Sequence, residues 1–206
     1  MSEEVVADFT GKLLTEDIDQ LKPVKGRVLL NREQLVLVTG EGKESIFLSK
    51  IVSTNPGSVA DSVSQFLAEA IAIAYERNGN RRQAIIGSSP ETIAKFRTLL
   101  FKLLIGKQTV IAKHPAKRGG RVTNAPARKM LLDLSESAIE LSADDKTARI
   151  NVEAVIGFEH EQRELMDRAR PTLILDHAAG STTLTTYISL LSKRKLTFLS
   201  QFVRLN

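Results

Sequence analysis

The stretch LVLVTGEG, at residues 35–42, decides the fold, because it joins an apolar strand to a tight turn and its pattern recurs later in the chain. At an offset of 104 residues it falls on IELSADDK, residues 139–146. The apolar positions that follow also correspond: Ile46, Leu48, Ile51 and Val52 fall on Ile150, Val152, Val155 and Ile156. At an offset of 102, Ile71, Ile86, Phe96 and Leu100 fall on Leu173, Ile188, Phe198 and Phe202. This repeated apolar pattern predicts an internal duplication.

Both halves show the same series of short strands. In the first half, runs rich in Val, Ile and Leu predict strands at 4–14, 27–30, 34–38, 44–48, 70–76 and 82–87. In the second half, similar runs predict strands at 108–113, 128–132, 138–141, 147–150, 155–159, 173–177 and 183–188. Asn78-Gly79 is typical of a tight hairpin turn. A short helix is expected after residue 55, where Val59, Val63, Phe66 and Leu67 have helical spacing.

Each half ends in an amphipathic helix. The segment 88–91, SSPE, supplies a cap, a proline suited to the first helical position and negative charge for the first turn, and Gly106 ends the helix. The second helix begins near Ser192 and runs to the end of the chain. About seven antiparallel strands closed by a C-terminal helix are typical of pleckstrin-homology-like domains. The predicted fold is therefore mainly β with α, in the α+β class, as two such domains in tandem at residues 1–106 and 107–206.

The composition is that of a globular protein. The chain has 206 residues, of which 42% are hydrophobic and 26% are charged, and it has no cysteine. No disulfide framework or thiolate metal site can therefore form. No run approaches the length of uncharged apolar residues that spans a membrane, and the N-terminus, MSEE, is acidic. We expect a cytoplasmic protein with no membrane insertion.

The positive charge is confined to the second half. The formal net charge is +5; residues 1–106 carry 13 basic and 13 acidic residues, and residues 107–206 carry 16 and 11. The segment 107–132 has seven basic residues and no acidic one. We expect these cations in the loop between the first two strands of the second domain, as a partner-binding site made of Lys113, Lys117, Arg118, Arg121, Arg128 and Lys129. The corresponding first-domain loop, residues 15–20, is acidic, so the two copies are not equivalent.

The chain carries no catalytic signature. None of its Gly-Lys pairs has the spacing of a phosphate-binding loop. The three histidines, His114, His160 and His177, lack the spacing that places two imidazoles on one helical face. With no Trp and two Tyr, there is little aromatic surface for stacking nucleic-acid bases. We therefore expect no enzyme, no metal, no cofactor and no nucleic-acid partner.

Several segments together resemble a known family. They are EVVADFTG at 4–11, PVKGRVLL at 23–30, IIGS at 85–88, FRTLLF at 96–101, VIGFE at 155–159 and TTYIS at 185–189. These segments resemble the archaeal taxis adaptor family called CheF, and the resemblance covers most of the chain. It implies a non-catalytic cytoplasmic adaptor that links a phosphorylated CheY-type response regulator to the switch complex of the archaellum motor. Its partners would be this regulator, the switch-complex proteins and other taxis proteins. A homodimer would form through whichever apolar surface the two domains leave uncovered, and the sequence itself does not identify such a surface.

The resemblance also implies a C-terminal tail region beyond the position of Asn206. If the regulator docks chiefly on that tail, residues 1–206 would bind it poorly.

Two other functions use the same basic residues. The second domain could be a membrane-surface module that binds anions or phospholipids, and the same cations could contact nucleic acid. Binding to phosphate-rich ligands weakens steeply with salt, whereas an adaptor recognises one phosphorylated partner. Salt dependence and partner specificity therefore separate these alternatives.

Overall fold

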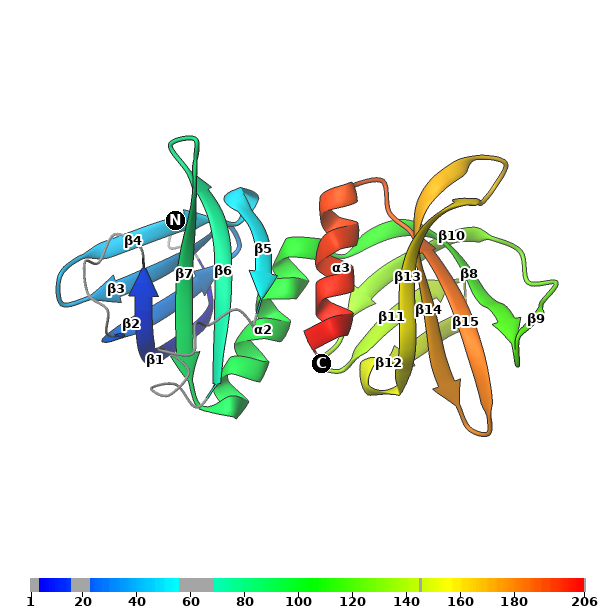
Figure 1. Ribbon diagram of the computed structural model, residues 1–206, viewed down its shortest axis with the longest axis horizontal. Coiled ribbons are helices and arrows are strands. Elements are labelled where there is room, and N and C mark those ends of the chain that lie inside the picture. The colour runs from blue at the N-terminus through cyan, green and yellow to red at the C-terminus, as the bar shows by residue number, and fades with distance from the viewer. Residues whose placement is uncertain (1–3, 16–22, 56–68, 145, 206) are drawn as a thin grey trace. The chain divides into compact units, whose positions relative to one another are not determined.

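The computed structural model describes residues 4–15, 23–55, 69–144 and 146–205 (Figure 1). Its contacts divide the chain into two compact units, Met1–Leu104 and Ile105–Asn206. The short helix expected after residue 55 lies outside the described residues, as does the acidic loop of the first half beyond Thr15.

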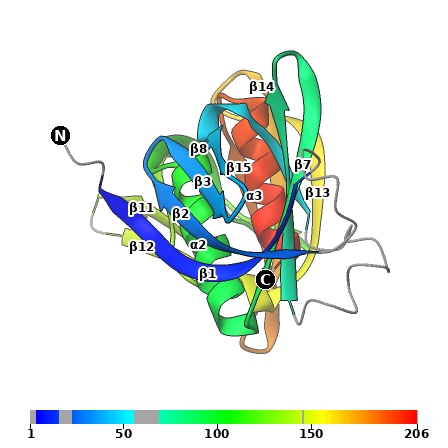
Figure 2. The same ribbon diagram turned by 90° about the vertical axis from the view of Figure 1, so that its left-hand side faces the viewer.

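Unit 1 is an antiparallel sheet followed by a helix. Its strands are β1 (Val5–Thr15), β2 (Val24–Asn31), β3 (Gln34–Thr39), β4 (Lys43–Phe47), β5 (Ile51–Asn55), β6 (Glu69–Arg77) and β7 (Asn80–Ser88). A 3-10 turn, η1 (Leu48–Lys50), separates β4 from β5, and helix α2 (Pro90–Ile105) follows β7. The strand order is β4-β3-β2-β1-β7-β6-β5. Figure 2 shows β1 and β2 running side by side along the curved sheet.

Unit 2 repeats this series. Its strands are β8 (Gln108–Arg118), β9 (Arg121–Val122), β10 (Arg128–Leu134), β11 (Ala138–Ala143), β12 (Lys146–Asn151), β13 (Val155–Glu164), β14 (Ala169–Ala179) and β15 (Thr182–Ser189). The turn η2 (Val152–Ala154) separates β12 from β13, and helix α3 (Lys193–Leu205) follows β15. The order is β12-β11-β10-β8-β15-β14-β13, with the short β9 paired to β8. The predicted α+β class is confirmed.

The two sheets share one pairing register, which confirms the internal duplication. The pair Leu35–Ile46 corresponds to Ile139–Ile150 at an offset of 104 residues. Ladder β6–β7 corresponds to β14–β15 at an offset of 102, and both sheets have a bulge at the start of the fifth main strand. The first strands correspond at an offset of 99, because Leu13–Ile86 matches Ala112–Ile188. The connection that follows β8 is therefore five residues longer than its counterpart in unit 1.

Both cores form in the same way. Alternate strand residues point into the sheet's concave side, where Leu13, Val28, Ile73 and Ile86 are buried in unit 1. The helices add apolar stripes of buried residues: Ile93, Phe96, Leu100 and Leu104 in α2, and Leu196, Leu199, Phe202 and Val203 in α3. Burial of these side chains is the main term that holds each unit together.

The helix ends follow the sequence signals. Ser89 precedes α2, and its hydroxyl oxygen accepts a hydrogen bond from the backbone N–H of Thr92 at 3.3 Å. Gly106, at the end of α2, has φ +69°, a conformation that glycine adopts without a steric penalty. Ser192 has the capping position of α3, with its hydroxyl 3.4 Å from the Lys195 nitrogen.

Candidate partner-binding site

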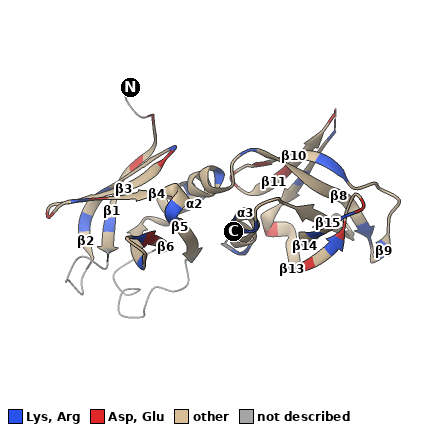
Figure 3. Cartoon of the chain, turned by 90° about the horizontal axis from the view of Figure 1, so that it is seen from above, with Lys and Arg blue, Asp and Glu red and all other residues tan. Residues whose placement is uncertain are grey.

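All six predicted cations lie in strands, which corrects the expectation of a loop. Lys113, Lys117 and Arg118 are in β8, Arg121 is in β9, and Arg128 and Lys129 begin β10. The predicted strand ended at residue 113, but β8 continues to Arg118 because β15 and β9 pair with this extension. Only the turn at Gly119-Gly120 and the segment 123–127 are loop. Figure 3 marks the Lys and Arg positions of this region in blue.

Three of the lysines share one face of the sheet. Directly paired residues of neighbouring strands point to the same side, as do residues two apart on one strand. Lys129 pairs with Ile111, which is two residues from Lys113. Lys113 in turn pairs with Tyr187, and Lys117 pairs with Thr185, two residues away on β15. We call Lys113, Lys117 and Lys129 the basic face; the opposite side of these strands is the core.

The three arginines lie apart from the basic face. Arg118 and Arg121 pair with each other across the β8–β9 turn, one residue out of phase with Lys117. Arg128 pairs with Ala112, a core position, and its guanidinium is 3.9 Å from the carboxylate of Asp144. The structure therefore brings together three of the six predicted residues and separates the rest.

The cations of the basic face have no carboxylate partner within the described part of the chain. No ion pair to Lys113, Lys117 or Lys129 is found there, and the same holds for the two arginines at the β8–β9 turn. Other cations of unit 2 are neutralised locally: Lys107 by Asp133 at 3.5 Å and Arg149 by Glu140 at 3.1 Å. The uncompensated positive charge of unit 2 thus includes the basic face, where it can attract an acidic ligand.

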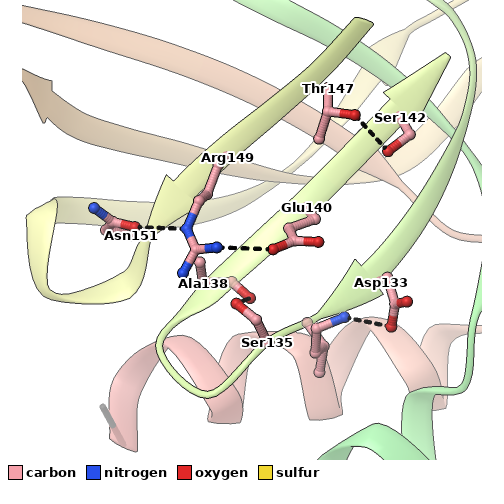
Figure 4. A network of polar contacts seen from close by, with 9 residues as sticks. Asp133, Ser135, Ala138, Glu140, Ser142, Thr147, Arg149 and Asn151 are labelled. Carbon is pink, nitrogen blue, oxygen red and sulfur yellow. Dashed lines mark hydrogen bonds and ion pairs between the residues drawn. The ribbon is translucent and has the colours of Figure 1, made fainter. Parts of the chain in front are cut away.

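On the neighbouring strands β11 and β12, the polar side chains bond to one another (Figure 4). Arg149 donates to Glu140 at 3.1 Å and to the side-chain oxygen of Asn151 at 3.3 Å. The hydroxyls of Ser142 and Thr147 are 3.0 Å apart. The donors and acceptors of this network are directed at one another, so this part of the sheet offers a partner less unpaired charge than the basic face does.

Tyr187 adds an aromatic ring to the basic face. The guanidinium of Arg163, on β13, lies 5.5 Å from the centre of this ring, which is a cation–π distance. The corresponding residues of unit 1 are apolar: Leu14 stands where unit 2 has Lys113, and Ile85 where it has Tyr187. In unit 1 these positions belong to an apolar cluster with Ala70 and Ala72. The fold therefore does not require a lysine and a tyrosine here.

Sequence reasoning did not select Tyr187. The signal was present in the repeat, since an offset of 102 residues places Ile85 on Tyr187. Comparing the two copies position by position would have shown the change from an apolar to a polar aromatic residue at one site.

Two histidines lie on the core side of β8 and β14, close to the basic face. His114 Nδ1 is 2.7 Å from the Thr186 hydroxyl, and His177 Nε2 is 3.1 Å from the same oxygen. Their rings are stacked with centres 5.8 Å apart. Burial lowers the pKa of His114, and the neighbouring imidazole lowers it further. Burial also lowers the pKa of His177, although Asp176 opposes this shift. Both imidazoles are thus held in the neutral form.

No group of three metal-ligating side chains is found within the residues that the structure describes. Among the described helices, neither is long and apolar enough to cross a membrane.

Comparison with known proteins now adds to this geometry. The family model for archaeal chemotaxis signal transduction system protein F matches residues 5–206. Taxis protein CheF2 of Halobacterium salinarum (strain ATCC 29341 / DSM 671 / R1) is 33% identical over 205 residues, covering 100% of this chain and 71% of that protein. Taxis protein CheF1 of the same strain is 26% identical over 197 residues, covering 91% of this chain and 66% of that protein. The family resemblance seen in the sequence is confirmed: the chain belongs to the archaeal CheF family of chemotaxis signal transduction proteins.

Proposed function

We propose that the chain is a non-catalytic cytoplasmic adaptor that links a phosphorylated CheY-type response regulator to the switch complex of the archaellum motor. The observation that carries this proposal is membership of the CheF family over residues 5–206. Both relatives are named as taxis proteins. The adaptor works through partners in the taxis system at the motor, and its two units are pleckstrin-homology-like scaffolds, in keeping with their seven-strand-plus-helix order.

The basic face is the surface that we assign to the regulator. A phosphorylated receiver gains about two negative charges at neutral pH, which raises its attraction to a cluster of unpaired lysines. An adaptor needs such a difference, because only a ligand that binds one state better than another can transmit a signal. The basic face meets this need with Lys113, Lys117 and Lys129 on one side of the sheet.

The test is capture of the regulator from the same organism, with and without activation by beryllofluoride. We expect the wild-type chain to retain the activated form at least tenfold better than the inactive form. Replacing Lys113, Lys117 and Lys129 together with Ser should abolish this preference. The matched control replaces three exposed lysines of unit 1, Lys25, Lys43 and Lys50, which changes the net charge equally. If both triple variants lose the regulator alike, net charge and not the basic face explains binding.

Anion or phospholipid binding is a second function that the unpaired cations favour. Vesicles containing anionic phospholipid provide the probe, with neutral vesicles as the control. Retention on anionic vesicles that falls steeply between low and physiological salt, together with indifference to regulator activation, would support this alternative over the adaptor.

A further inference from the structure

Two exposed apolar side chains stand on the same side of the sheet as the basic face, one at each end of it. Val122 of β9 is 72% exposed and pairs directly with Lys117, so both side chains point to one side. Leu131 of β10 is 39% exposed and lies two residues from Lys129, which again places both on one side. Strand pairing and strand alternation therefore put each apolar side chain next to a lysine of the basic face.

The two apolar side chains are separated by most of the length of β8. Leu131 pairs with Thr109, and Val122 pairs with Lys117, eight residues farther along the same strand. At about 3.3 Å per residue, the two side chains are roughly 25 Å apart, with the basic face between them. A patch of about 800 Å², which is what each partner buries in a protein–protein interface of ordinary size, is about this wide.

Unit 1 shows that the fold does not require an apolar residue at the position of Leu131. Arg27 is the equivalent residue, since its partner Thr10 stands where unit 2 has Thr109. Arg27 donates to the Asp8 carboxylate at 2.8 Å, so unit 1 has a surface ion pair at this position. The short β9 has no counterpart among the described strands of unit 1. Both apolar side chains therefore distinguish unit 2 from unit 1.

Two acidic side chains on this side of the sheet already have partners. Asp133, two residues beyond Leu131 on β10, is 3.5 Å from the ammonium group of Lys107. Asp176 is in the row of Lys117, and its carboxylate accepts a hydrogen bond from the Thr185 hydroxyl at 2.5 Å. The lysines of the basic face are therefore available to an acidic partner.

We propose that Val122 and Leu131 are apolar anchors at the two ends of the basic face, which docks a protein whose acidic patch lies between two apolar contacts. This inference rests on the proposed function, since it takes the activated response regulator as that protein. The lysines steer the partner and govern the association rate, whereas the anchors exclude water and govern the dissociation rate. A phosphate group alone would use the lysines but would leave both anchors in water.

The experiment measures the association and dissociation rates of the beryllofluoride-activated regulator of the same organism on the full 206-residue chain. The anchor variant combines Val122→Thr and Leu131→Thr, because threonine suits a strand but replaces apolar atoms with a hydroxyl. Its affinity should fall about tenfold, as for truncation of interface anchors, and the loss should lie in the dissociation rate. Since no charge is removed, the loss should be equal at low and at physiological salt.

The matched control makes the same kind of change at two exposed apolar positions outside the basic face. It combines Val5→Thr and Ile156→Thr, at residues that are 51% and 66% exposed. The control should bind like wild type, and both double variants should keep the wild-type melting temperature within about 3 °C. The triple lysine variant should differ from the anchor variant in kind, because its loss lies in the association rate and shrinks as salt is added.

Two results would overturn the inference directly. One is an anchor variant with the wild-type dissociation rate, and the other is an equal loss of affinity in the matched control. Anionic vesicles provide a further arm. Wild-type binding to vesicles that depends on Val122 and Leu131, with regulator binding that does not, would assign the anchors to a bilayer and overturn the protein partner.

The outcome for the proposed function is read separately. If the wild-type chain binds no activated regulator, the proposed function and the inference fail together. If it binds activated and inactive regulator equally and the anchor variant weakens both, the proposed function fails and the anchors stand. If the wild type prefers the activated regulator and the anchor variant binds like wild type, only the inference fails.

Discussion

Thr186 holds two imidazoles with one hydroxyl, and this arrangement makes unit 2 sensitive to acid. The hydroxyl can donate to one neutral ring and accept from the other, so His114 and His177 are both satisfied without a proton. Because burial lowers both pKa values in the folded state, the unfolded chain binds more protons as the pH falls below about 6.5. The stabilisation is complete above that pH and is lost as the pH falls toward the lowered folded-state pKa.

We therefore predict that the melting temperature of unit 2 falls between pH 7.5 and pH 5.5. In the variant His114→Gln, which keeps a hydrogen-bonding side chain but cannot take up a proton, the fall should be clearly smaller. Calorimetry at the two pH values measures both. Carboxylates with lowered pKa, such as Asp8 beside Arg27, titrate at lower pH and do not disturb this window. Equal losses in the wild type and the variant would show that the histidine pair does not titrate in this range.

At Gly26, any side chain would clash with neighbouring atoms of the sheet. A Cβ at this position of β2 would lie 2.4 Å from a methyl carbon of Leu13 and 2.6 Å from the backbone carbonyl oxygen of Val38. Since the carbonyl belongs to the neighbouring strand, it cannot move without disturbing the sheet. Gly26→Ala should therefore destabilise unit 1 by about 1–3 kcal/mol, measured by denaturant unfolding. Gly42→Ala is the control, because no atom lies within 4 Å of its Cβ position, and its stability should change little.

At the scale of elements, the N-terminal caps of α2 and α3 are expected to stabilise their units by different amounts. Ser89 accepts from the Thr92 N–H at 3.3 Å and its hydroxyl is 2.8 Å from that of Thr92. Ser89→Ala should cost about 1 kcal/mol of unit 1 stability. Ser192→Ala should cost unit 2 less, because the Ser192 hydroxyl is farther, 3.4 Å, from the Lys195 nitrogen. Chemical unfolding of both variants tests this order, and a larger loss for Ser192→Ala would contradict it.

The sequence predicted elements best where a local signal specified them. Both helices were predicted because caps, proline, glycine and apolar stripes agree, and tertiary contacts only reinforce them. The extension of β8 was missed because Pro115 and Gly119-Gly120 are typical of a loop. What makes this segment a strand is pairing with β15, which is about 70 residues away in the chain and leaves no trace in local sequence. Long-range pairing overrides local preference here.

The candidate site was predicted in composition but not in geometry. Charge counting alone selected six of the seven basic residues of the segment 107–132. Which of them share a face depends on knowing that residues 108–118 are all strand and how this strand pairs. Simple alternation along β8 then places Lys113 and Lys117 on one side and Arg118 on the other. Lys129 joins the two lysines only through the pairing of β10 with β8, which the local sequence does not reveal.

At the scale of the whole molecule, the duplication predicts that each half folds alone. Each unit has its own sheet, helix and buried core, and the contacts divide near the predicted junction at residue 106. Residues 1–106 and 107–206, expressed separately, should each unfold in one cooperative transition with well-dispersed amide resonances. A half that is unfolded alone but folds when mixed with the other would show that the two depend on each other.

Because the two sheets share one pairing register, equivalent strands of unit 1 and unit 2 can replace one another. The ladder β8–β10 pairs Val110 with Met130 where β1–β2 pairs Gly11 with Gly26, so the strands can be exchanged without a shift of phase. Grafting the segment 108–134 in place of 9–30 would bring with it the five additional residues of the β8–β10 connection, which includes the extension of β8 and the short β9. Segment 108–134 is therefore a suitable donor for transferring the cationic surface of unit 2 to unit 1.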